Sequence, residues 1–237
     1  MSTQGQSYER DPRWTSVDTY SFSHLHPTGS TPSPDTLTHA LTNSANKNLP
    51  DIAVSPSQGK FLKLQAQIAR AKSVLEIGTL GGYSTIWLAA AGPDVKVVSV
   101  EVDEHHADVA RENIAHAGLE KQVEVVLGAG VEVLPRLVED IKAGKREKFD
   151  LVFIDADKEN NWNYVDVALG GVRSGAVVIV DNVVRKGELA REGTGDSRVE
   201  GAREVVEKIG RDQRLDGVVV QTVGEKNYDG FLIAVAR

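Results

Sequence analysis

From Ser73 to the C-terminus, short apolar runs alternate with stretches of helical periodicity, and no other feature of this chain limits its fold as strongly. Between several of the runs, apolar residues recur every three or four positions, as helices require. Near-continuous apolar strands that alternate with helices are typical of a parallel sheet covered on both faces. The sequence therefore predicts an α/β fold with a mainly parallel sheet. The predicted strands are residues 73–77, 96–100, 123–127, 150–154, 176–180, 217–221 and 231–235.

The N-terminal part does not follow this pattern. Residues 1–35 are rich in serine, threonine and proline, so we expect much of this segment to be irregular. Helical periodicity begins near Asp35 and returns over residues 57–70. We therefore divide the chain into an N-terminal arm with a helix, residues 1–50, and a main domain, residues 51–237.

Composition excludes several classes of function. The 237 residues carry a formal net charge of −7, which argues against a nucleic-acid partner, because phosphate binding needs a basic surface. The chain has no cysteine, so disulfides and thiolate metal sites are excluded. No apolar run approaches the roughly 18 residues of a membrane span, and the N-terminus lacks the apolar segment of a secretory signal. We expect a cytoplasmic protein that binds neither nucleic acid nor membrane, and leave a mitochondrial location open.

Polar or glycine-rich residues stand at the ends of five successive predicted strands. In open α/β sheets, ligands bind beyond the carboxyl ends of the strands. These ends therefore predict where a binding site lies. In chain order they carry Glu76 with residues 78–84, Glu101, residues 128–130, residues 155–158, and Asp181 with Asn182.

The first two strand ends suggest a nucleoside-containing cofactor. The glycines of GTLGGYS (78–84) would let the backbone approach a ligand, although an ordinary tight turn is the simpler alternative. Glu101 lies 23 residues beyond Gly78, where an acid accepts hydrogen bonds from a ribose in nicotinamide or adenosyl cofactors. It could instead merely flank the next helix, for which Asp103 is the better N-cap.

The first loop separates the two kinds of cofactor. Its glycines follow the pattern G-x-x-G-G, which does not match the dinucleotide fingerprint G-x-G-x-x-G. Glu76, inside the strand, would repel the phosphates of a dinucleotide but suits a cofactor with a cationic end. S-adenosylmethionine carries a sulfonium, an ammonium and a ribose, and no phosphate. A nicotinamide-dependent oxidoreductase is therefore the weaker alternative.

The segment VLEIGTLGGYSTIWLA (74–89) resembles the first motif of class I methyltransferases, in the form found in cation-dependent O-methyltransferases. FDLVFIDADK (149–158), followed by VIVDNV (178–183), is the more specific part of this resemblance to the catechol and caffeoyl-coenzyme A O-methyltransferase family. The resemblance extends from about Val54 to the C-terminus. It implies a Rossmann-like fold with seven strands, the last antiparallel, a methyltransferase domain over residues 51–237, and a homodimer. Residues 1–50 become a candidate lid or dimer contact.

The resemblance also implies a metal site. Asp155, Asp181 and Asn182 follow two strands expected to be adjacent, and their oxygens suit Mg²⁺, Ca²⁺ or Mn²⁺ better than zinc. For each acid alone, a helix cap or a solvated strand end is the simpler explanation. The family gives Lys158 the role of accepting the proton of the substrate hydroxyl or stabilising the phenolate. A surface lysine is the alternative.

By the same resemblance, further residues bind S-adenosylmethionine. Those expected at the methionine and ribose parts are Glu76, Gly78, Thr79, Gly82, Ser84 and Glu101. Gly130 is expected against the adenine, Asp157 to face the cofactor, and Val54 to close over it. The implied function is divalent-cation-dependent methyl transfer to a hydroxyl of a vicinal diphenol, such as a polyphenol, flavonoid or caffeoyl derivative. A non-catalytic scaffold is a second alternative, which the intact set of charged residues opposes.

Several residues near these motifs are harder to interpret. Many members of the family have a tyrosine where this chain has Asn161, so we expect the substitution to affect the shape of the substrate site. We expect Trp162 and Tyr164 to pack in the core, with stacking on the substrate as the alternative, and His105 and His106 to be exposed. The loop from Arg185 to Arg198 either lines the acceptor pocket or is solvated.

Overall fold

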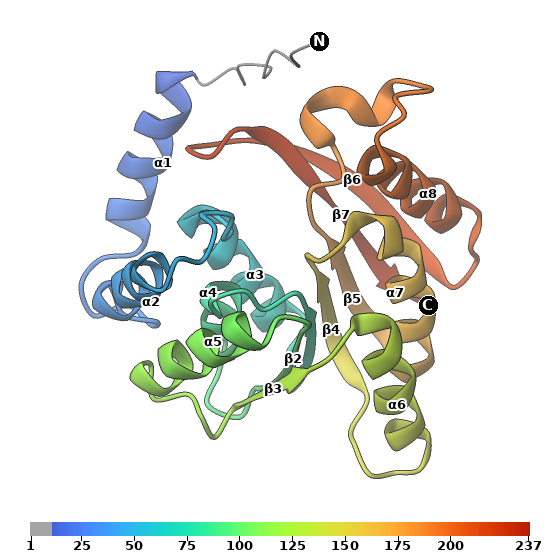
Figure 1. Cartoon of the computed structure of the whole chain (residues 1–237), viewed down its shortest axis with the longest axis horizontal. Coiled ribbons are helices and arrows are strands. Elements are labelled where there is room, and N and C mark those ends of the chain that lie inside the picture. Colours follow the sequence, from blue (N-terminus) through green and yellow to red (C-terminus); the bar gives the residue numbers. More distant parts are fainter. Residues whose placement is uncertain (1–10) are drawn as a thin grey trace.

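The computed structural model describes residues 11–237 of the chain (Figure 1). Its α-helices are α1 (Pro12–Leu25), α2 (Pro34–Asn46), α3 (Pro56–Ile68), α4 (Tyr83–Ala89), α5 (Glu104–His116), α6 (Gly130–Lys142), α7 (Asn161–Ala168) and α8 (Ser197–Arg211). Its strands are β1 (Ser73–Ile77), β2 (Lys96–Glu101), β3 (Val123–Leu127), β4 (Phe149–Ile154), β5 (Val172–Val180), β6 (Leu215–Val223) and β7 (Tyr228–Ala236). Short 3₁₀ segments are η1 (Lys158–Asn160), η2 (Leu169–Gly171) and η3 (Arg185–Ala190).

The strands form one seven-stranded sheet in the order β3-β2-β1-β4-β5-β7-β6. The pairs among β1 to β5 are parallel, whereas β7 is antiparallel to both β5 and β6. The predicted Rossmann-like sheet with an antiparallel last strand is therefore confirmed. Within the described residues, no helix is long and apolar enough to cross a membrane.

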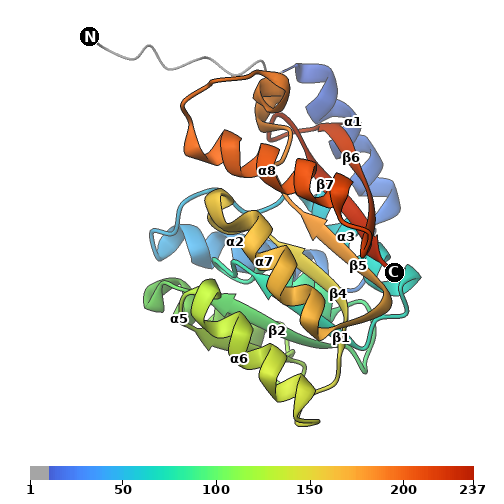
Figure 2. The same ribbon diagram turned by 90° about the vertical axis from the view of Figure 1, so that its right-hand side faces the viewer.

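Helices cover the two faces of the sheet with separate cores. Leu75 and Ile77 of β1 face the core formed with α6, α7 and α8, which lie side by side in front of the sheet in Figure 2. Val74 faces the opposite core, formed with α3, α4 and α5. Alternate residues of a strand point to opposite faces, so Glu76 enters the second core together with Val74. A carboxylate in such a place needs polar partners.

The register of three central strands brings the sequence motifs together. Ile77 of β1 pairs with Ile154 of β4, and Ile154 pairs with Val180 of β5. The next residues in the chain are Gly78, Asp155 and Asp181, so these three lie in a row at the strand ends. The backbone N–H of Asp155 donates to the Ile77 carbonyl at 2.9 Å, and that of Asp181 donates to Ile154 at 2.9 Å. The ladder therefore holds both aspartates beyond the strands proper.

The expectation that much of residues 1–35 is irregular is wrong for the described part of this segment, because α1 is a helix of 14 residues, and residues 1–10 lie outside the described residues. Asp11 caps it by accepting a hydrogen bond from the Arg13 N–H, and Pro12 occupies the first turn, where a missing N–H costs nothing. Pro34 starts α2 in the same way after the Ser33 cap. No residue of α1 is buried, and the prolines, serines and threonines in and around the helix are the residues from which the sequence suggests an irregular segment.

The structure contains the other helices that the sequence predicts. α2 begins at Pro34, close to the expected start at Asp35, and α3 covers most of residues 57–70. Asp103 is the N-cap of α5, as expected, and accepts a hydrogen bond from the His106 N–H at 3.1 Å. His105 is exposed, whereas His106 is half-buried. The expected homodimer and the lid or dimer role of residues 1–50 stay predictions.

Gly78 is the point at which two strand-end loops touch, and its replacement tests this packing. Its φ is +96°, and a Cβ there would overlap the backbone carbonyl oxygen of Asp155. Gly118 is a matched control, because its φ is +70° but a Cβ would meet nothing within 4 Å. We expect Gly118→Ala to cost about 1 kcal/mol for the left-handed conformation alone, and Gly78→Ala about 3 kcal/mol because overpacking adds to it. Urea unfolding measures both losses, and equal losses would contradict the proposed contact.

Candidate functional site

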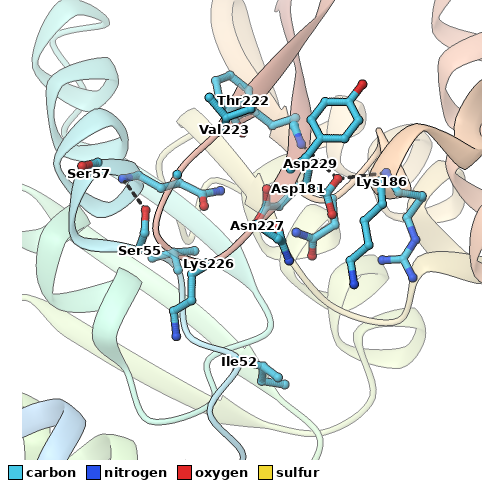
Figure 3. Close-up of a pocket in the computed structure, with 18 of the residues that line it drawn as sticks. Ile52, Ser55, Ser57, Asp181, Lys186, Thr222, Val223, Lys226, Asn227 and Asp229 are labelled. Carbon is cyan, nitrogen blue, oxygen red and sulfur yellow. Dashed lines mark hydrogen bonds between the residues drawn. The ribbon is translucent and has the colours of Figure 1, made fainter. Parts of the chain in front are cut away.

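Two adjoining cavities lie at the carboxyl edge of the sheet. The glycine-loop cavity, about 1360 Å³, is lined mainly by the loops after β1 to β4, and the hairpin cavity, about 1250 Å³, by Phe61, Asp181 and residues of the β6–β7 hairpin. Figure 3 shows the hairpin cavity, with Asp181 and Asp229 facing Ser55 and Lys226 across it. Residues 51–54, which include the buried Val54, line both cavities, as do Asn182 and Arg185. The two spaces therefore meet at the loop after β5.

Glu76 lies behind the wall of the glycine-loop cavity. It is fully buried, and its carboxylate accepts hydrogen bonds from Ser84 at 2.6 Å, from Ser99 at 2.6 Å, and from Thr85. Burial raises the pKa of Glu76 to about 7, and the charge of Asp155 adds to this rise, although the three hydroxyl donors oppose it. Of this cluster, Ser84 reaches the cavity. Glu76 therefore acts on a ligand through hydroxyl groups, directly through Ser84 and through Ser99 by way of Thr79.

The hydroxyl of Ser84 is consequently polarised in one direction. Its proton is donated to Glu76, so the lone pairs of its oxygen remain for a ligand in the cavity. Such an oxygen accepts hydrogen bonds and suits a cationic donor. Thr79 lies nearby on the same wall, and its hydroxyl pairs with Ser99 at 2.6 Å.

Glu101 holds the glycine loop in place. One carboxylate oxygen accepts from the N–H groups of Thr79 at 3.1 Å and Leu80 at 2.7 Å, and the other accepts from Val102 at 2.9 Å and Asp103 at 3.0 Å. A carboxylate offers about four acceptor positions, and all four are used here. Glu101 lines the glycine-loop cavity and is 7% exposed. A ligand that bonds to Glu101 must therefore displace backbone partners.

The three glycines predicted in the site are required for different structural reasons. Gly78 allows contact with the Asp155 backbone, whereas Gly82, at φ +77°, caps α4 and does not line either cavity. Gly130 lines the glycine-loop cavity, and a Cβ there would lie 2.8 Å from the Tyr164 ring. Packing against Tyr164 therefore accounts for Gly130 without a ligand, while still leaving a flat wall for one.

Asp157 and Tyr164 form one side of the same cavity. The Tyr164 hydroxyl donates to the exposed Asp157 carboxylate at 2.5 Å, and burial, followed by Asp157, raises the pKa of the phenol. The expectation that Tyr164 packs in the core is confirmed, because it is 4% exposed, but it also lines the cavity.

Trp162 packs against the core formed with α6, α7 and α8, and Lys208 of α8 lies 5.4 Å from its ring centre. Asn161 is fully buried and lines neither cavity, so its substitution for tyrosine changes packing beneath the site.

The acidic end of β4 and that of β5 meet at the boundary of the cavities. Asp155 lines the glycine-loop cavity, Asp181 lines the hairpin cavity, and Asn182 lines both. Burial raises the pKa of Asp181 to about 7, with the charge of Asp155 as the second cause. Asn182 has a φ of +54°, a left-handed conformation that asparagine tolerates well. Two carboxylates and an amide thus share one small region.

Lys158 lies just behind this group. It is 8% exposed, and its Nζ donates to Asp155 Oδ1 at 2.6 Å. It lines neither cavity, so it reaches a ligand only by turning away from Asp155. Within residues 11–237, no group of three or more histidine, cysteine, aspartate or glutamate side chains is arranged to hold a metal. The candidate set contains only two such residues and owes its third donor to Asn182.

Sequence reasoning identified only part of the hairpin cavity. Its walls combine α1, α3, the η3 loop and the β6–β7 hairpin, so no single motif reveals it. Of the predicted loop, Arg185, Lys186 and Arg198 do line it. The residues that no sequence pattern singled out are Trp14, Asp18, Phe61, Thr222, Lys226, Tyr228 and Asp229.

Comparison with known proteins agrees with this geometry. The O-methyltransferase family model matches residues 28–233. The O-methyltransferase imqG of Aspergillus flavus is 46% identical over 98% of this chain and 94% of its own length. A catechol O-methyltransferase of Mycobacterium tuberculosis is 49% identical over 85% of this chain and 88% of its own. The crystal structure of an O-methyltransferase from Bacillus cereus in complex with SAH superposes with a TM-score of 0.88, at 46% identity, over 95% of this chain and 99% of that one.

These matches remove the nicotinamide-dependent alternative. They span both the strand-end motifs and the sheet that positions them. On this combination of fold, strand-end residues and family match, the chain belongs to the class I S-adenosylmethionine-dependent O-methyltransferase family.

Proposed function

We propose that this enzyme methylates one hydroxyl of a vicinal diphenol, such as a catechol, polyphenol, flavonoid or caffeoyl derivative, with the help of a divalent cation. One observation carries the proposal: the oxygens of Asp155, Asp181 and Asn182 stand where the two cavities meet. A methyl donor in one cavity and an acceptor in the other would have their reacting atoms at this boundary. The catechol O-methyltransferase relative and the SAH complex support the two assignments.

The residues at the boundary fit a hard cation such as Mg²⁺, Ca²⁺ or Mn²⁺. Carboxylate and amide oxygens are the donors these ions prefer. Asp181 is buried beside a second carboxylate, and this repulsion is what a divalent charge would relieve. Asp155, Asp181 and Asn182 would hold the ion. When bound, it would supply Lewis-acid chemistry, raising the acidity of a phenol whose pKa is otherwise about 10.

The glycine-loop cavity would hold S-adenosylmethionine, which supplies the methyl group. The Ser84 oxygen, its proton committed to Glu76, would accept from the cofactor ammonium. The ribose would bond to Glu101 in place of some of its backbone partners. Gly130 would give the adenine a flat wall, Asp157 would border the cofactor, and Val54 would separate it from the hairpin cavity.

Lys158 would deal with the proton of the reacting hydroxyl. Its ammonium is buried and is fixed by Asp155, one side chain behind the boundary. Turned from Asp155 toward the boundary, it would accept the proton as the neutral amine, or as the ammonium stabilise the oxygen that has lost its proton. The residues on the two sides would then hold donor and acceptor in line, and this positioning is itself a large part of the acceleration.

Removal of divalent cations tests the metal part of the proposal. We expect methylation of catechol to stop in EDTA and to return with excess Mg²⁺, since the acceptor would lose its acidity and its fixed orientation. Calorimetry should show Mg²⁺ binding to the native protein and none to Asp155→Ala. SAH affinity of this variant should stay within about threefold, because Asp155, although it lines the glycine-loop cavity, is assigned to the ion and not to the cofactor. Turnover that persists in EDTA would refute cation dependence.

Replacement of Lys158 tests its role in the proton transfer. Lys158→Gln should lower kcat by about 100-fold or more, the usual scale of a lost general base, with SAH affinity changed less than threefold. Lys208→Gln is a matched control, because Lys208 lies against Trp162 and outside both cavities. An unchanged kcat in Lys158→Gln would remove Lys158 from the proposed chemistry.

The raised pKa of Glu76 predicts how cofactor affinity depends on pH. In the free protein this pKa is about 7, and a cofactor ammonium beyond Ser84 would lower it by favouring the ionised form. Binding should then release a proton, so SAH affinity should rise with pH up to about 7 and level off above it. Calorimetry without metal measures this affinity between about pH 6 and 7.5. This range lies below the usual α-amino pKa of about 7.7, so the cofactor ammonium keeps its charge.

Glu76→Gln supplies the comparison for this experiment. The variant keeps the shape of the side chain but has no proton to release, so its SAH affinity should vary less with pH than that of the native protein. Titrations in two buffers of different ionisation enthalpy measure the proton release directly. Equal release by the native protein and Glu76→Gln would show that Glu76 does not sense the cofactor.

A further inference from the structure

Arg185 combines an unusual position with an unsatisfied charge. Its side chain lines both cavities, three residues beyond Asn182. Its guanidinium forms no ion pair among residues 11–237, and its buried Nε has no hydrogen-bond partner there. The other two cations that line both cavities are paired, Arg198 with Asp196 at 2.8 Å and Lys226 with Asp51 at 2.6 Å. A partly buried cation at a cavity wall favours a bonded anion, and among residues 11–237 no carboxylate lies within ion-pair distance of Arg185.

The nearest carboxylates are already occupied. Asp229 Oδ1 accepts from the backbone N–H groups of Arg185 and Gly230, each at 2.9 Å. Asp196 accepts from the backbone and guanidinium of Arg198. Arg198 lowers the pKa of Asp196, with a small contribution from Arg185, and burial raises the pKa of Asp229 against the opposing charge of Arg185. Arg185 therefore lies near both acids, yet neither acid bonds to its guanidinium. The side chain of Arg185 therefore remains available to a ligand.

The backbone holds this side chain in place at a cost. Arg185 has a φ of +52° and Lys186 a φ of +58°, a conformation that costs about 1 kcal/mol or more for a residue with a Cβ. The hydrogen bond from the Arg185 N–H to Asp229 ties this turn to β7. Strain of this kind, retained by an outside contact, is typical of ligand-binding segments.

We infer that Arg185 binds a carboxylate on the acceptor, so that the substrates are vicinal diphenols that carry an acidic group. A guanidinium matches the two oxygens of a carboxylate in a bidentate pair. The position at the boundary would let such a pair orient the ring while its hydroxyls face Asp181 and Asn182. This inference rests on the proposed function. The cofactor also has a carboxylate, but Ser84 and the glycine loop are where we place the amino-acid end of the cofactor.

Two diphenols that differ only in charge test the inference. We compare 3,4-dihydroxybenzoate with the neutral 3,4-dihydroxybenzamide, using the native enzyme, Arg185→Gln and Arg185→Lys. The native enzyme should favour the acid in kcat/KM by at least about tenfold, the scale of a charge-assisted hydrogen bond. Arg185→Gln should remove this preference, mainly through KM, while the amide changes by less than threefold. Arg185→Lys, which keeps the charge without the fork, should retain part of the preference.

Arg191→Gln is the matched control for charge. Arg191 lies just after η3, is exposed, pairs with Glu188 at 3.3 Å and lines neither cavity. This variant removes the same charge from the same loop and should keep the preference for the acid. If Arg191→Gln abolished it as well, the preference would come from general electrostatics and the inference would fail.

Two binding measurements separate the possible failures. SAH affinity of Arg185→Gln should stay within about twofold, and a loss of tenfold with equal effects on both diphenols would assign Arg185 to the cofactor carboxylate instead. Calorimetric binding of 3,4-dihydroxybenzoate in the presence of SAH should weaken at least about tenfold in Arg185→Gln. If the native enzyme methylated neither diphenol, the proposed function would fail, whereas this binding result would still decide the role of Arg185. Equal binding by the native protein and Arg185→Gln would overturn the inference.

Discussion

The register of β1, β4 and β5 is the constraint on which the candidate site depends. Pairing of Ile77 with Ile154, and of Ile154 with Val180, sets the following residues side by side. The ladder bonds of Asp155 and Asp181 extend this order past the strand ends. A slip of one residue would turn these carboxylates toward the opposite face of the sheet. The apolar side chains on both faces oppose such a slip, so the cores that stabilise the fold also position the charges.

The same arrangement places charge where water is scarce. Glu76 is fully buried and Asp181 nearly so, and burial raises the pKa of both. Three hydroxyl groups donate hydrogen bonds to the Glu76 carboxylate, and Lys158 forms an ion pair with Asp155. Asp181 has fewer such partners for its charge. Replacement of buried charges by apolar groups of similar volume often leaves stability unchanged or raises it. Retention of these groups is therefore better explained by ligands that complete their pairing than by folding.

Local patterns in the sequence reveal the half of the site that the sheet builds. Apolar runs identify the strands, and the polar residues after them follow directly in the chain, so Asp155 and Asp181 are predictable. How deeply each side chain lies cannot be predicted in this way. No pattern distinguishes Ser84, on the cavity wall, from Glu76 and Lys158, which lie behind it. The four backbone partners of Glu101 and the packing of Gly130 on Tyr164 likewise depend on loops that meet only after folding.

The two cavities consequently differ in how many of their lining residues can be substituted without disturbing the sheet. The glycine-loop cavity is formed by strand ends whose positions follow from the sheet. The hairpin cavity is formed by α1, η3 and the β6–β7 hairpin, which lie at the edge of the molecule (Figure 1). Substitutions in α1, η3 or the hairpin can alter this cavity without changing the strand register that positions Asp155 and Asp181. Arg185 lines both cavities and is tied to β7 through Asp229, so it connects the hairpin wall to the strand-end residues that the sheet positions.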